Sequence, residues 1–279
     1  MAPKVGSHTR SSSLPSRSHP VTSKVEEHLN RLKASEATST SSVCYKLRAL
    51  EDLYECVDDM LQLPVVQQIL SNNCHDKCIE NLLDGSLTVL DVCSSTKDIL
   101  SQLKDSVQNF ESSLRRKRGE TGLANEVRNY MNSRKNINRV VCKILRNLKG
   151  NEKKQLLDKD CNLLAVVGIL REVEEISFLV FESVLSSISQ SKARAKPGSW
   201  FIISKLMRPK RIVCEGEVEE IDELDVVNVG KCTSFERLQI LLKSLKALES
   251  NIQDLEDGLE RMYRRLIKSR VALLNILSQ

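Results

Sequence analysis

Apolar residues along most of the chain recur at spacings of three and four, which is the period of an α-helix. Between residues 43 and 61 they form one continuous stripe. A helix here should end near Leu63, because Pro64 disfavours helical geometry in the residue before it. A short apolar cluster at 65–70 predicts a short helix, and the pattern over 79–114 predicts a long one. The fold class is therefore predicted to be all-α.

The second half of the chain continues this pattern with clear interruptions. Apolar residues over 123–148 form a stripe that only Arg134 interrupts, and the polar run at 149–154 then breaks the pattern. Another stripe runs over 163–188 and ends at the segment 191–199. Short polar breaks between long helices favour antiparallel neighbours, so we predict an elongated antiparallel helical bundle.

The last predicted helix, over 234–277, has the most regular pattern in the chain. Apolar residues repeat every seven positions, with a second series between them, and only Ser269 breaks the seam. The two series are Leu238, Leu245, Ile252, Leu259, Leu266 and Leu273, and Leu241, Leu248, Leu255, Met262 and Ile276. This helix should be about 66 Å long, whereas a compact domain of this size is about 45 Å across. Leu242, Tyr263 and Leu277 widen the stripe, which favours packing within one chain over a dimeric zipper, so we expect a monomer.

The chain begins with a segment of different composition. Residues 1–23 are basic and rich in serine and proline, and no acidic residue precedes Glu26. We predict a disordered N-terminal arm over 1–23 and a helical-bundle domain over 24–279. Seven acidic residues over 215–225 predict a mobile acidic loop near 208–233, with docking to a basic partner or to the bundle's own basic surface as the alternative.

Composition excludes several classes of protein. Apolar residues make up 41% and charged residues 28% of the chain, which is ordinary for a folded globular domain. The net charge of +5 comes largely from the arm and aromatic residues are only 4%, so nucleic acid is not an expected partner. No apolar run is long enough for a transmembrane segment. Nine cysteines without a repeating spacing fit a reduced compartment, so a cytoplasmic location is expected.

The arm holds one candidate binding motif. Arg10, Ser11, Ser13 and Pro15 fit the pattern RSxSxP, which 14-3-3 proteins bind when the central serine, here Ser13, is phosphorylated. The alternative is a flexible tail whose small polar residues form no core. The arm also shares the serine-rich, acid-free composition of transit peptides, which makes a plastid an alternative location.

Other candidate groups favour structural interpretations. The basic cluster at 115–118 could be a nuclear import signal, but a solvated loop between helices is favoured. The segment CHDKC at 74–78 offers zinc ligands but lacks a second pair, so we expect no metal. Asp58 and Asp59 are expected on a charged, solvated helix face. Because no hydrolase, metalloprotease or phosphate-binding motif occurs, we expect neither enzymatic activity nor a cofactor.

A series of motifs spans the chain. They are RSSSLPSRSHP at 10–20, LYECVDDMLQLPVVQQIL at 53–70, DGSLTVLDVC at 84–93, LRRKRG at 114–119, NYMNSRKNINRVVCKILRNLK at 129–149 and GSWFIISKLM at 198–207, followed by the long terminal helix. Together they resemble the plant BYPASS-type family over essentially the whole chain. The resemblance implies a plant-specific helical protein involved in root and shoot development, in a family without an established enzymatic activity or cofactor.

These observations favour a non-enzymatic regulatory or scaffold protein that acts through protein–protein interaction. The phosphorylatable arm would control one interaction, and the partners are otherwise unknown. The alternative is a peripheral membrane-associated helical protein, which would bind anionic lipid through its basic arm and a transiently exposed apolar helix. The developmental role rests on the resemblance alone.

Overall fold

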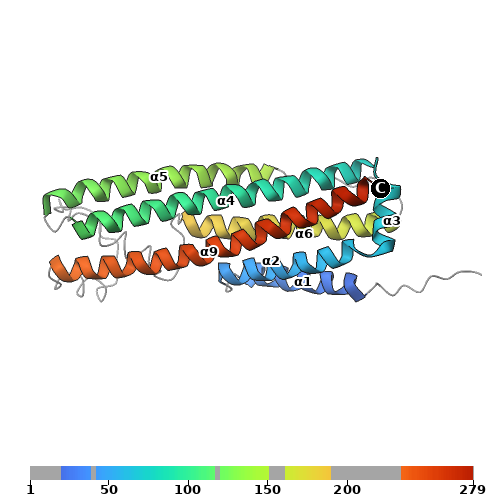
Figure 1. Ribbon diagram of the computed structural model, residues 1–279, viewed down its shortest axis with the longest axis horizontal. Coiled ribbons are helices and arrows are strands. Elements are labelled where there is room, and N and C mark those ends of the chain that lie inside the picture. Colours follow the sequence, from blue (N-terminus) through green and yellow to red (C-terminus); the bar gives the residue numbers. More distant parts are fainter. Residues whose placement is uncertain (1–19, 39–41, 117–119, 151–160, 190–233, 279) are drawn as a thin grey trace, which may run out of the picture.

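The computed structural model describes residues 20–38, 42–116, 120–150, 161–189 and 234–278. Every element within these ranges is an α-helix (Figure 1), which confirms the predicted all-α class. The helices are α1 (Pro20–Thr38), α2 (Val43–Leu61), α3 (Pro64–Asn72), α4 (Lys77–Arg116), α5 (Glu120–Gly150), α6 (Cys161–Ser189) and α9 (Ser234–Leu277). The predicted acidic loop near 208–233 lies outside the described residues.

The long helices run side by side, which gives the elongated bundle that the sequence predicts (Figure 1). α9 packs against both α4 and α2. It runs antiparallel to α4, because Lys97 pairs with Glu260 whereas Lys104, farther along α4, pairs with the earlier Glu256. α4 in turn packs against α5.

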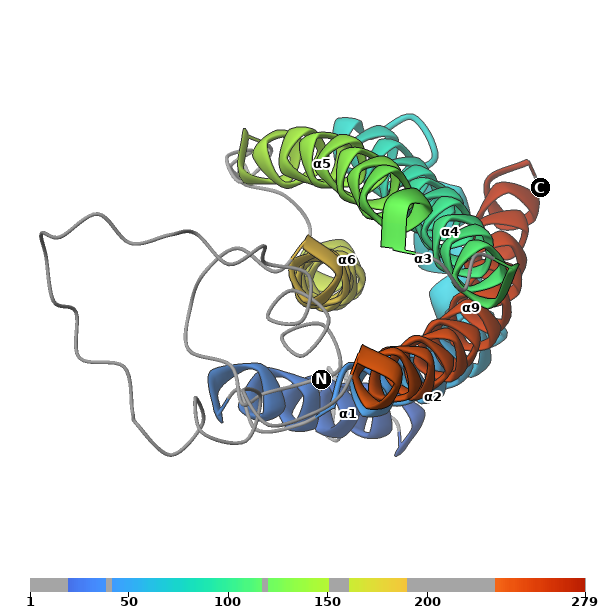
Figure 2. The ribbon, with the colours of Figure 1, turned by 90° about the vertical axis from the view of Figure 1, so that its left-hand side faces the viewer.

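α6 occupies the centre of the bundle. Figure 2 shows α5, α4, α9, α2 and α1 arranged as an arc around it, and α6 packs against α4, α2, α5 and α1. This position follows from its sequence, because its apolar side chains lie on several sides of the helix and not on one stripe. The buried ones are Leu163, Val167, Leu170, Val173, Ile176, Val180, Phe181, Val184, Leu185 and Ile188. Such a helix is stable only when several neighbours cover it.

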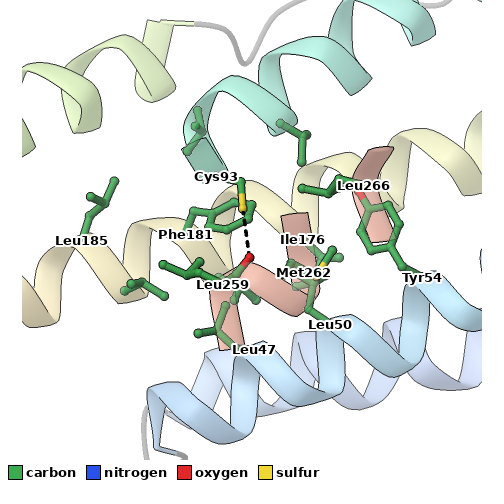
Figure 3. Close-up of a cluster of buried hydrophobic side chains, with 14 of the residues drawn as sticks. Leu47, Leu50, Tyr54, Cys93, Ile176, Phe181, Leu185, Leu259, Met262 and Leu266 are labelled. Carbon is green, nitrogen blue, oxygen red and sulfur yellow. Dashed lines mark hydrogen bonds between the residues drawn. The ribbon is translucent and has the colours of Figure 1, made fainter. Parts of the chain in front are cut away.

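The apolar seam of α9 is buried by helices of the same chain. Leu245, Leu259 and Met262 are fully buried, and in Figure 3 the α9 side chains lie among those of α2, α4 and α6. The thiol of Cys93 on α4 approaches the carbonyl oxygen of Leu259 at 3.8 Å within this cluster. Burial of each such side chain contributes roughly 2 kcal/mol before conformational entropy is subtracted. The seam therefore holds the bundle together from inside one chain, as the width of its stripe predicts.

One core helix was not predicted from the sequence. α1 begins at Pro20, inside the segment expected to form the arm, so the helical part starts before residue 24 and the first core helix precedes 43–61. Proline suits the first helical turn because its φ is preset and its missing N–H has no helical partner there. Val25, Leu29 and Leu32 are buried in the core, and α1 packs against α2 and α6. Their spacing of four and three was a usable signal, set among many polar residues.

The turn between α2 and α3 forms where the sequence predicts it. α2 starts after Ser42, whose hydroxyl oxygen accepts a hydrogen bond from the backbone N–H of Tyr45 at 3.2 Å. It ends at Leu61, and Pro64 occupies the first turn of α3. This turn fixes the start of α3 beside α9.

Candidate functional site

A polar recess lies where α2, α4, α6 and α9 meet in the otherwise apolar core. Its cavity has a volume of about 30 Å³, which is enough space for about two water molecules. The polar side chains that line it are Tyr54 of α2, Ser86 of α4, Glu174 of α6, and Ser269 and Arg270 of α9. The recess is thus built from four helices that are distant in sequence.

Glu174 places a carboxyl group against Gly85 of α4. A Cβ atom at Gly85 would lie 2.3 Å from Oε2 of Glu174, so the absent side chain makes room for the carboxyl group. Among the described residues, Oε1 of Glu174 is buried without a hydrogen-bond partner. Burial raises the pKa of Glu174 to about 8, although the charge of Arg171 opposes this shift. The group is therefore largely protonated and neutral at pH 7.

Tyr54 forms a hydrogen-bonded chain with α6. Its hydroxyl lies 3.1 Å from Oγ of Ser177, and that Oγ donates to the carbonyl oxygen of Val173 at 2.6 Å. Because the Ser177 proton is used in that way, the Tyr54 hydroxyl is the donor to Ser177. Burial raises the pKa of Tyr54, so the phenol remains neutral and serves to join α2 to α6.

Arg270 attaches α9 to the start of α4. Its Nη1 donates to Oγ of Ser86 at 2.6 Å and also to the carbonyl oxygen of Leu83. The guanidinium of Arg270 thus bridges α9 and α4, and it has no ion pair with a carboxylate of the described residues. The positive charge of Arg270 is thereby fixed at the edge of the recess.

Asp58 is buried, so its predicted place on a solvated helix face is wrong. Only 5% of Asp58 is exposed, whereas Asp59 is exposed as expected. Its Oδ1 accepts a hydrogen bond from Ser269, and its Oδ2 lies 3.1 Å from Nζ of Lys268. Ser269, which interrupts the apolar seam of α9, therefore makes a polar contact with α2. No pattern within α2 alone indicates this, because the partner side chains come from α9.

The thiols of Cys44, Cys56 and Cys93 are not activated. Burial raises the pKa of Cys93 to about 12, and burial likewise raises the pKa of Cys44 and Cys56. A nucleophilic cysteine needs a lowered pKa, since the thiolate is the reactive form. Cys93 and the neutral Tyr54 serve packing and hydrogen bonding in the core.

The other candidates from the sequence are placed as follows. Cys74 is partly buried and Cys78 is buried, and within the described ranges no three His, Cys, Asp or Glu side chains are grouped as a metal site. Arg115 and Arg116 form the last turn of α4, where Arg115 pairs with Glu111.

The four residues of the candidate phospho-docking motif in the arm lie outside the described part of the chain. They are Arg10, Ser11, Ser13 and Pro15.

The extent of the bundle agrees with a known protein family. A family model described as Protein BPS1 matches residues 46–276, from the first turn of α2 almost to the end of α9. The chain belongs to the BPS1 family. This confirms the BYPASS-type resemblance and places the chain among plant proteins that are related to development. No curated protein and no solved structure matched the chain.

The BPS1 match separates two parts of the bundle. It includes the polar recess but begins after α1, which therefore lies outside the matched region. In the recess of this BPS1-family chain, Glu174 and Arg270 were not predicted from the sequence. Ser177, which is hydrogen-bonded to Tyr54, was not predicted either. Gly85, inside a long predicted helix, was the available signal that a large group approaches there.

The described helices of this BPS1-family chain include none that could cross a membrane, since none combines sufficient length with sufficient apolar character. The apolar seam of α9 is covered by α2 and α4.

Proposed function

We propose that this protein is a non-enzymatic regulatory or scaffold protein of plants, and that it acts in root and shoot development through protein–protein interaction. The observation that carries the proposal is the use of the ionisable groups in the bundle. Among the described residues, several buried or partly buried ionisable groups join helices to one another, and the polar recess that some of them line has room for only about two waters.

The attachment of α1 supports a regulatory role for the arm. Nζ of Lys46 on α2 lies 2.7 Å from Oε2 of Glu36 on α1, and Oγ of Ser183 on α6 donates to the same oxygen at 2.9 Å. Lys46 is 5% exposed, so this contact is largely shielded from solvent. Ser13 precedes Pro20, the first residue of α1, by seven positions. A partner bound to the arm would therefore be held beside a helix that is fixed to the bundle.

The proposed interaction of the arm is with 14-3-3 protein. Phosphorylation of Ser13 adds about two negative charges, which an arginine cluster in the partner can bind in several directions. Phosphorylated full-length protein should recover 14-3-3 protein in a pull-down, and Ser13→Ala should abolish that recovery. Ser16→Ala, in the same arm but outside RSxSxP, is the matched control and should leave recovery unchanged.

Equal recovery by the wild type and Ser13→Ala would eliminate this docking mode without removing the broader scaffold proposal. Proximity labelling in root tissue tests the broader proposal, because it reports neighbouring proteins and the compartment together. We propose a cytoplasmic location, with the nucleus and the plastid as the alternatives that the labelled proteins would reveal. Labelling that returns no protein above a free-label control would contradict a scaffold role.

A further inference from the structure

The outward face of α5 carries a row of bases. Its members, which we call the basic stripe, are Arg128, Lys135, Arg139, Lys143 and Arg146. Steps of seven, four, four and three residues keep all five on one face of a helix, opposite the buried Tyr130, Ile137 and Val141. All five are exposed, and the sequence contains no acidic residue between Glu126 and Glu152.

The basic stripe has no counter-charge in the described part of the bundle. Arg139 donates to Oδ1 of Asn136 and Arg146 to the carbonyl oxygen of Cys142, so both bonds stay within α5. Neither Lys135 nor Lys143 forms an ion pair with any described carboxylate. Like charges four residues apart repel by a few tenths of a kcal/mol. The repulsion within the stripe therefore costs the helix some stability, and no ion pair with a described carboxylate offsets it.

None of the other described helices covers this face of α5. α5 lies at one end of the arc of helices in Figure 2 and packs against α4 and α6 on its other side. The exposed residues of the neighbouring α4 include Asp84, Asp91, Asp98 and Asp105, each seven positions from the next. A flat anionic surface broad enough to touch both helices would meet these carboxylates. A narrow anionic partner along α5 alone avoids them.

We infer that the basic stripe binds an acidic α-helix of a partner protein, laid along α5. From Arg128 to Arg146 the stripe spans about 27 Å at 1.5 Å per residue, or about five turns of a partner helix. Aromatic stacking for nucleic-acid bases is missing here, because Tyr130, the aromatic residue of α5, is buried and stacked on Phe110 at 4.8 Å between ring centroids. This inference rests on the proposed scaffold function and names the chemistry of one partner.

A pair of synthetic helical peptides tests the inference on the full-length chain. One peptide carries glutamates at the spacing of the basic stripe, and the second has the same composition in scrambled order. Fluorescence anisotropy should give at least tenfold tighter binding of the matched peptide, weakening as salt is raised. The triple variant Lys135→Glu, Arg139→Glu and Lys143→Glu should reduce that binding at least tenfold.

A double variant on another helix is the matched control. Lys243 and Lys246 are exposed on α9 and have no ion pair with a described carboxylate. Lys243→Glu with Lys246→Glu should therefore leave binding of the matched peptide within twofold. Circular dichroism of both variants shows whether the helices remain folded, so a loss of binding in a folded triple variant is specific to the stripe.

Two free cysteines locate the binding face independently. Cys142 is exposed beside Lys143, whereas Cys44 is exposed on α2 and serves as an internal reference. The matched peptide should slow alkylation of Cys142 by iodoacetamide at least threefold and leave the rate at Cys44 unchanged, as followed by mass spectrometry. Equal rates at Cys142 with and without bound peptide would place the peptide elsewhere and overturn the inference.

The remaining outcomes are also decisive. Equal affinity for the matched and scrambled peptides would overturn the inference. A second contrary outcome is that neither peptide binds, while the wild type floats with phosphatidylserine vesicles and the triple variant does not; the stripe would then bind lipid. Proximity labelling separates this failure from failure of the scaffold function. If the triple variant labels the same proteins as the wild type, the α5 site is wrong and the scaffold proposal stands.

Discussion

The two helices α9 and α5 use positive charge in opposite ways. On α9, Arg261 pairs with Glu51 of α2 at 3.1 Å, and Lys268 pairs with the buried Asp58 of α2. On α5, the basic stripe contacts no described carboxylate. A cation within reach of a carboxylate fixes the register of two helices, whereas one without a partner is available to another molecule.

The same contrast appears in the apolar positions. α9 lies between α4 and α2, so its seven-residue seam is covered from two sides, whereas α5 is at the end of the arc and uses only one face. α9 therefore contributes mainly to stability, whereas α5 keeps a face available for binding. Each prediction below tests that division, beginning with the largest expected effect.

Truncation of the α9 seam should cost far more stability than truncation of the exposed side of α5. Leu259 is fully buried, so Leu259→Ala should lower the free energy of unfolding by about 3 kcal/mol through lost burial and a residual cavity. Val140 on α5 is 45% exposed, and Val140→Ala should change stability by less than about 0.5 kcal/mol. Urea unfolding followed by circular dichroism measures both, and similar losses would contradict the division.

Removal of the carboxyl group of Glu174, in the recess that α9 helps to line, should change how the stability of the protein depends on pH. The folded-state pKa of Glu174 is about 8, above its ordinary value of 4.5, because burial favours the protonated form. The resulting stability is present below about pH 4.5 and is lost as pH rises through about 8. Between pH 5 and 9, the free energy of unfolding of the wild type should therefore fall by roughly 2 kcal/mol more than that of Glu174→Gln. This value takes the partial exposure of the Glu174 side chain into account.

The neighbouring Glu175 supplies the control for this pH effect. It is exposed on the same helix, so Glu175→Gln should keep the pH dependence of the wild type. Thermal melts at several pH values give the comparison. Parallel curves for the wild type and Glu174→Gln would show that the carboxyl group is ionised in the folded protein and would contradict the assignment.

Reversing one positive charge should raise the free energy of unfolding on α5 and lower it on α9. Of the three predicted effects on stability, this one is the smallest. Arg139→Glu places a carboxylate four residues from both Lys135 and Lys143, so it should raise stability by about 0.5 kcal/mol. Arg261→Glu removes the pair with Glu51 and sets two carboxylates together, so it should lower stability by about 0.5 kcal/mol or more. Chemical unfolding at low salt measures both changes. If Arg139→Glu were destabilising, the stripe would serve the fold and not a partner.

Much of the fold could be predicted because helical periodicity is a local signal. The limits of α9, the stop of α2 before Pro64 and the long α4 were all expected. α1 was missed because its three buried apolar residues, at 25, 29 and 32, lie among polar ones and follow a serine-rich segment. Arg134 interrupts an apolar stripe for a reason that only packing reveals, since its Nη2 donates to the carbonyl oxygen of Ile188 near the end of α6.

The site residues were less predictable than the helices. Asp58 and Asp59 are adjacent in sequence and identical in chemistry, yet one is buried against Lys268 and the other is exposed. Glu174 and Glu175 are likewise identical neighbours, and they differ only because Gly85 of α4 lies against the carboxyl group of Glu174. A single sequence gives no reason to distinguish the members of either pair, because the groups that differ belong to other helices.

The amino-acid order by itself determined where the helices form and which face of each is apolar, since both depend on residues within a few positions of each other. It also determined the run of bases on α5, because no acid interrupts it. Tertiary structure decided that α6 is central and which charges are neutralised. The contact of Lys268 with Asp58 joins residues more than two hundred positions apart, and only packing brings such atoms within the few ångströms at which ion pairs and hydrogen bonds act.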